Sequence, residues 1–84
     1  MRKTHELKIL HKYFDDVIKN RKTFEIRKND RHYKVEDILI LREYNGRNYT
    51  GCKVTAEVMY ILEDFEGLKE GYVVMGIKVL KVKI

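Results

Sequence analysis

The sequence is poor in residues that fix a fold by covalent or rigid means. Its 84 residues include one cysteine, Cys52, and no proline. A single cysteine cannot close an intrachain disulfide or supply the several thiolates of a cysteine-based zinc site. The three histidines, at positions 5, 11 and 32, lack the spacing typical of metal ligands. We therefore expect no metal and no cofactor, and turns built from Asn, Asp and Gly.

Long apolar runs are missing as well. The apolar stretches at residues 38–41 and 72–75 are far shorter than the roughly 18 residues that a membrane-spanning helix requires. Residues 1–8 carry several charges and have no apolar segment of the kind found in signal peptides. These features predict a protein that does not enter the membrane, and we expect it to be cytoplasmic.

Enough apolar material is nevertheless present for a packed core. Hydrophobic residues make up 44% of the chain and include six Tyr and three Phe, whereas charged residues make up 37%. This composition is typical of a globular protein and not of a disordered tail. A chain of this length buries only about 60 to 65% of its unfolded surface and cannot hold two cores. The sequence predicts one domain over residues 1–84.

Positive charge is unevenly distributed along the chain. The formal net charge is +5, from 18 basic and 13 acidic residues. Basic residues are densest between positions 19 and 34, where only Glu25 and Asp30 oppose them. They are Lys19, Arg21, Lys22, Arg27, Lys28, Arg31 and Lys34. Such a cluster creates a local positive potential that suits phosphates and other anions, although a solvated basic face is the alternative interpretation.

The hydrophobic pattern predicts five strands and one short helix. Period-two alternation favours strands at residues 4–9, 23–27, 38–44, 53–62 and 72–84. Apolar residues at three- and four-residue spacing predict an amphipathic helix over residues 10–19, and Asn20 can take the left-handed conformation that ends a helix. Because the chain lacks a β-α-β alternation, we expect an α+β fold, an antiparallel or mixed barrel with the helix packed on it.

The second predicted strand carries the best candidate site. If Phe24 and Ile26 point into the core, Glu25 and Arg27 share the opposite face, about 6.6 Å apart along the strand. Lys22 lies where the chain enters this strand and can lean over the same surface. The spacing therefore predicts a Lys, Glu and Arg group at one mouth of the barrel, with Phe24 and Ile26 buried behind it.

Such a group supports more than one kind of chemistry. Arg offers a planar fork for a phosphate or a base edge, Lys offers a point charge, and Glu can accept from an exocyclic amine. This combination favours nucleotide recognition. Alternatively, a Lys beside an Arg in a partly dry pocket loses its proton more readily and can act as a general base or nucleophile. A surface ion-pair ladder without any ligand is the third interpretation.

The aromatic residues divide into two expected groups. Those at core-facing spacings should pack inside the barrel, and they are Tyr13, Phe14, Phe24 and Tyr60. Tyr33 and Tyr72 lie near expected loops, where an aromatic ring can stack on a base. We therefore include Tyr33 and Tyr72 among the candidate ligand-binding residues.

Several motifs in order resemble a known family. The run KTFEIRKNDR at residues 22–31, preceded by HELKI at 5–9, resembles the ASCH domain family, whose K-x-x-E-x-R core falls on Lys22, Glu25 and Arg27. The segments DILILREY, YTG, VTAEVMYIL and GLKEGYVVMGI, beginning at positions 37, 49, 54 and 67, are similar to a compact bacterial and phage-associated ASCH subgroup of unassigned function. The resemblance covers nearly the whole chain.

This resemblance implies a PUA-like β-barrel of about five to six strands with one short helix packed on it. Members of that superfamily often bind RNA or modified nucleobases in a cleft between barrel and helix. The family usually has Gly at the position of Asn20, which can adopt the same left-handed geometry. The resemblance and the charge pattern together predict a ligand-binding set of Lys22, Glu25, Arg27, Lys28, Arg31, Tyr33 and Tyr72. We expect an RNA- or nucleotide-binding module.

Two alternatives remain beside the binding module. A branch similar to this family removes acyl groups from N4-acylated cytidine with a Lys, a Thr three residues later and a distant Glu. Here Glu25 stands three residues after Lys22, so a small amidohydrolase would have to use Lys22 and Glu25 as catalytic residues. Candidates for the distant carboxylate lie at positions 63, 66 and 70. The second alternative is a protein-interaction adaptor whose acidic loop at residues 63–70 meets a partner.

Overall fold

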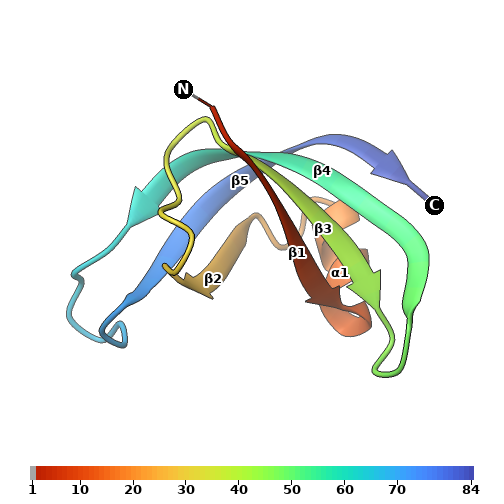
Figure 1. The fold of residues 1–84 in the computed structure, drawn as a ribbon, viewed down its shortest axis with the longest axis horizontal. Helices are drawn as coiled ribbons and strands as arrows, with labels where there is room; N and C mark the ends of the chain where they lie inside the picture. Colours follow the sequence, from red (N-terminus) through yellow and green to blue (C-terminus); the bar gives the residue numbers. More distant parts are fainter. Residues whose placement is uncertain (1) are drawn as a thin grey trace.

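Across residues 2–84, which the computed structural model describes, the chain forms a curled sheet with one short helix in its hollow (Figure 1). The elements in chain order are β1 (Thr4–Leu10), α1 (His11–Ile18), β2 (Phe24–Lys28), β3 (Ile38–Tyr44), β4 (Tyr49–Leu62) and β5 (Tyr72–Lys83). Every predicted element is present, and the ends differ by a few residues. β4 shows the largest difference, because it begins at Tyr49 and not at residue 53.

The sheet is mixed, with the strand order β1-β3-β4-β5-β2. β1 runs parallel to β3, and the other neighbours are antiparallel. Twist curls the strands into a half-barrel, and α1 lies under the arch (Figure 1). The structure thus confirms the prediction of a barrel-like α+β fold.

Arginine side chains bridge the two edge strands, β1 and β2. Arg27 Nη2 donates to the carbonyl oxygen of Lys8 at 2.7 Å, and Arg31 Nη1 donates to that of Glu6 at 2.9 Å. Both carbonyls belong to β1, whereas Arg27 lies on β2 and Arg31 follows it. We call this side-chain junction between the edge strands the seam.

The core fills the concave side of the sheet. Leu39 and Leu41 of β3 are fully buried there, as are Val54 and Val58 of β4. The helix contributes its apolar face through two buried side chains, Phe14 and Val17. It has eight residues, and Asn20 beyond it has a φ of 60°, which confirms the predicted left-handed position. No helix within residues 2–84 is long and apolar enough to cross a membrane.

A β-bulge corrects the prediction for the inward face of β4. Val58 pairs with Ile77, but Tyr60 pairs with the next residue of β5, Gly76, so an extra β4 residue lies between the two pairs. An extra residue reverses the inside-outside alternation beyond it. Tyr60, predicted in the core, is therefore 67% exposed. Tyr13 of α1, also predicted in the core, is exposed as well. Among the aromatic residues expected inside, Phe14 is buried as predicted.

A buried carboxylate holds the connection between β2 and β3. Asp37 accepts hydrogen bonds from the backbone N–H groups of Lys3 and Lys34, each at 3.0 Å, and lies 2.8 Å from Nε2 of His5. The ring of Tyr33 packs edge-on against His5. Burial by itself would raise the pKa of Asp37, but the hydrogen bonds from His5 and the two backbone groups lower the pKa below its usual value. The loop is thereby fastened to β1.

Candidate ligand-binding cleft

A cleft of about 800 Å³ lies between the two edge strands and the helix. Its walls come from residues 8–10 of β1, Tyr13 and Asp16 of α1, residues 21–22, and residues 24–27 of β2. Pockets of this size are typical of small-molecule sites, which commonly measure about 300 to 1,000 Å³. The cleft combines apolar walls with charged groups that converge on one point.

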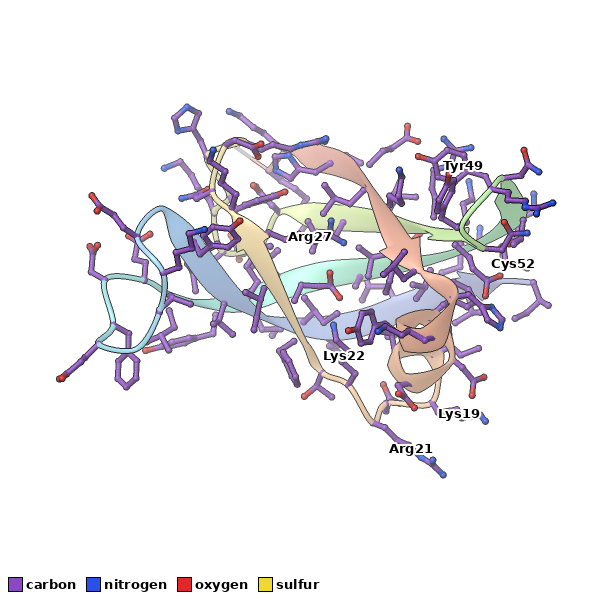
Figure 2. All side chains as sticks on the ribbon, turned by 90° about the horizontal axis from the view of Figure 1, so that it is seen from below. Lys19, Arg21, Lys22, Arg27, Tyr49 and Cys52 are labelled. Atoms are coloured by element: carbon purple, nitrogen blue, oxygen red, sulfur yellow. The ribbon has the colours of Figure 1, made fainter. Side chains whose placement is uncertain are left out.

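That point is the carboxylate of Glu25, which is 3% exposed. Lys22 Nζ donates to Oε2 at 2.6 Å, and Arg27 donates to Oε1 through Nε at 3.0 Å and Nη2 at 2.9 Å. The predicted convergence of Lys22, Glu25 and Arg27 is therefore confirmed as geometry, and Figure 2 shows Arg27 on β2 and Lys22 just before that strand. Two cations face one carboxylate, so the group keeps one net positive charge.

The expectation that Phe24 and Ile26 are buried is wrong. Their side chains are 43% and 53% exposed, whereas Glu25 between them is buried. Period two correctly places Glu25 and Arg27 on one face, but that face is the concave one. An inward carboxylate is tolerated because two cations bind it, and a buried charge without such partners would be costly.

The ammonium group of Lys22 lies between two aromatic rings at the cleft wall. Its Nζ is 5.4 Å from the ring centroid of Tyr13 and 5.0 Å from that of Phe24. It also donates to the carbonyl oxygen of Phe24 at 2.8 Å. Tyr13 and Phe24 remain about two-fifths exposed, so each presents part of its ring to a ligand. The cleft thus offers donors beside aromatic faces.

The other predicted ligand-binding residues lie outside this cleft. Tyr33 is 5% exposed in the core, where burial raises the pKa of its hydroxyl. Arg31 is at the seam, and Lys28 and Tyr72 pair across β2 and β5 beyond the cleft walls. The structure therefore brings Lys22, Glu25 and Arg27 together and separates these four from them.

The family resemblance implied a cleft between barrel and helix, but sequence reasoning did not name Lys8 or Tyr13 among its lining residues. Lys8 and Tyr13 line the cleft although they precede the basic segment. Tyr13 lies next to the buried Phe14 on the same helix, and no feature of the sequence indicated that Tyr13 would remain exposed. The carbonyl oxygen of Lys8 accepts a hydrogen bond from Arg27 of β2, and Tyr13 lies beside Lys22 just before that strand.

Fewer basic side chains between positions 19 and 34 are available to a ligand than the composition indicates. Lys19 pairs with Asp15 at 2.8 Å within the helical turn, and that hydrogen bond raises the pKa of Lys19. Lys22 and Arg27 are engaged by Glu25, and Arg31 by a backbone carbonyl. Among these cations, Arg21 lines the cleft and is exposed (Figure 2), whereas Lys22 and Arg27 offer only the N–H groups that Glu25 leaves unused.

These features define a small half-barrel domain with a cleft at its seam, lined by Tyr13, Phe24 and the group of Lys22, Glu25 and Arg27. Residues 4–77 match the family model described as "Domain of unknown function (DUF3850)", and the chain belongs to this family. It is also 41% identical over 75 residues to an uncharacterized 12.9 kDa protein encoded in the GpA 3' region of Escherichia phage P2. That match covers 89% of this chain and 68% of the phage protein.

Proposed function

We infer that this protein is an ASCH-type, PUA-like module that binds RNA or a nucleotide-type ligand in the cleft. The observation that carries the inference is the group of Lys22, Glu25 and Arg27, which keeps one positive charge beside two partly exposed rings. A nucleotide matches this arrangement because it joins a flat aromatic base to an anionic phosphate.

The hydrogen-bond donors of the cleft limit the chemical classes of ligand that it favours. Both oxygens of Glu25 are already occupied, and its carboxylate is buried. Lys22 and Arg27 therefore present N–H donors to a ligand, and Asp16 is the one other carboxylate among the described lining residues. Such a surface favours phosphates and base edges rich in acceptors over exocyclic amines. The walls, formed in part by Tyr13 and Phe24, supply faces on which a base can stack.

The arrangement favours binding over hydrolysis of an acylated nucleoside. Lys22 donates to a carboxylate and to a carbonyl, which is the behaviour of a cation in a recognition site. Glu63, Glu66 and Glu70 lie between β4 and β5 and are not among the described residues that line the cleft. The carboxylates that line it are Glu25 and Asp16.

Fluorescence anisotropy with labelled single-stranded RNA, and calorimetry with nucleoside monophosphates, test the proposal. Tyr13→Ala should lower affinity by about 5- to 150-fold, because stacking of a base on an aromatic side chain contributes about 1 to 3 kcal/mol. Tyr60→Ala is the matched control, because Tyr60 is exposed and does not line the cleft. Equal effects of the two substitutions, or no binding of any nucleotide at low salt, would contradict the proposal.

A further inference from the structure

A row of four basic residues crosses the convex face of the sheet, away from the cleft floor. Lys8 of β1 lies directly opposite Arg42 of β3, which lies opposite Lys53 of β4, which lies opposite Lys83 of β5. All four residues are exposed. At roughly 4.8 Å between neighbouring strands, this cation row is about 14 Å long.

The cation row is unfavourable for the folded protein by itself. Like charges directly opposite one another on adjacent strands are destabilising, and the row contains three successive pairs of this kind. Among the ion pairs within residues 2–84, one reaches the row, from Glu6 to Arg42 at 3.8 Å, and both side chains are largely solvated. The row therefore keeps most of its positive charge available to an anion.

Two tyrosines accompany the cation row at one end. The Arg42 guanidinium lies 4.3 Å from the ring centroid of Tyr49, and Lys8 Nζ lies 4.2 Å from that of Tyr44. Tyr49 is 44% exposed and lies at the β3–β4 hairpin, far from Lys22 and Arg27 (Figure 2). A hollow of about 430 Å³ lies beside it, with Arg42, Lys53 and Lys83 among its walls.

We propose that the cation row is a track for the sugar-phosphate backbone of single-stranded nucleic acid. Aligned cations neutralise successive phosphates, and a nearby exposed ring stacks a base without selecting its identity. An acidic protein surface would form ion pairs with the cations, but it has no base to stack on the ring of Tyr49. The pairing of a charged row with an exposed aromatic ring therefore favours nucleic acid.

The cation row joins the cleft at Lys8. The side chain of Lys8 begins the row, its carbonyl oxygen accepts the seam hydrogen bond from Arg27, and the residue lines the cleft. A strand with one base in the cleft can therefore continue over β1 toward β5. The track rests on the proposed function only in sharing its ligand class, because Lys8 is the one described residue that the two surfaces have in common.

The test measures binding of a labelled single-stranded RNA of about 12 nucleotides over a range of salt concentrations. For single strands, the logarithm of affinity falls by about 0.7 per contacted phosphate for each decade of salt. The double variant Lys53→Gln/Lys83→Gln should therefore reduce the slope by about 1.4. The control Lys34→Gln/Lys69→Gln removes the same charge from exposed lysines outside the row and should leave the slope unchanged.

The results of these experiments distinguish the proposal of a track from the proposal of a binding cleft. If Lys53→Gln/Lys83→Gln and its control change the slope equally, the track is wrong, even when nucleoside monophosphates still bind in the cleft. If the row variant alone changes the slope while Tyr13→Ala has no effect, the track stands and the cleft proposal fails. Competition by polyglutamate as strong as that by unlabelled RNA would also overturn the assignment, because the row would then accept any acidic chain.

Discussion

Substitution of Glu25 by Gln should destabilise the protein strongly. The change keeps the side-chain size but removes the negative charge on which Lys22 and Arg27 converge. Gln also places an amide N–H₂ group against one of the two cations, where it cannot accept a hydrogen bond. The two cations would then lie close together without a counter-charge.

The magnitude follows from the burial of the three side chains. Removing one partner of a buried ion pair costs about 3 to 5 kcal/mol. The side chain of Glu25 is 4% exposed, but those of Lys22 and Arg27 are 18% and 24% exposed, so solvent reduces the penalty. We expect a loss of about 3 kcal/mol in the free energy of unfolding. For a domain of this size, that loss lowers the melting temperature by about 12 to 24 °C.

Urea denaturation followed by far-ultraviolet circular dichroism measures this loss, since the chain has no tryptophan to report unfolding by fluorescence. Glu57→Gln is the matched control. Glu57 also lies on a strand, but its ion pair with Arg2 spans 3.6 Å, and the Arg2 side chain is 54% exposed. Such pairs contribute about 0 to 1 kcal/mol. If Glu25→Gln costs no more than Glu57→Gln, the idea that Glu25 organises the cleft is refuted.

Three further predictions concern acid stability, hydrolysis and the cation row. Because the pKa of Asp37 is lowered in the folded protein, its ionised carboxylate stabilises the fold above the usual pKa of 3.8. This stabilisation is lost as the pH falls through the lower folded pKa. Asp37→Asn should therefore weaken the dependence of the urea midpoint on pH in that range. A midpoint that falls equally in both proteins would contradict this role. Chromatography should detect no release, or only very slow release, of cytidine from N4-acetylcytidine. Glu25→Thr should raise that release only if another carboxylate serves the reaction, and robust turnover that disappears in Lys22→Ala would instead establish an enzyme. Lys53→Gln should raise the melting temperature slightly by removing like-charge contacts, and a lower melting temperature would show that these contacts carry no strain.

The elements of the fold were predictable because they depend on local periodicity. Alternation placed β2 and β3 within one residue of their observed ends, and three- and four-residue spacing located α1. The shared face of Glu25 and Arg27 was predictable for the same reason, since residues two apart on a strand always point the same way.

Which face of a strand is buried was not predictable from the strand alone. Apolar Phe24 and Ile26 face outward because Glu25 has two cationic partners, one of them from outside the strand. The outward turn of Tyr60 depends on a bulge that is defined only against β5. Local alternation carries no information about such partners, and so it assigned the wrong side.

The cation row could not be predicted from the sequence, for a related reason. Its members lie at positions 8, 42, 53 and 83, and only the register of four strands aligns them. A charge count along the chain emphasised residues 19–34, where much of the charge is used internally. Charge density in sequence and charge density on the surface are different quantities in a sheet protein.

The seam gives the cleft an adjustable width. A fully closed barrel would join β1 and β2 by a ladder of backbone hydrogen bonds, whose spacing is the same whatever the side chains are. Here the reach of Arg27 and Arg31 sets the distance instead. Arg27 also binds the buried Glu25, but Arg31, among the described residues, bonds only to the carbonyl oxygen of Glu6, so substitution of Arg31 by a shorter residue should widen the opening without altering a strand pairing.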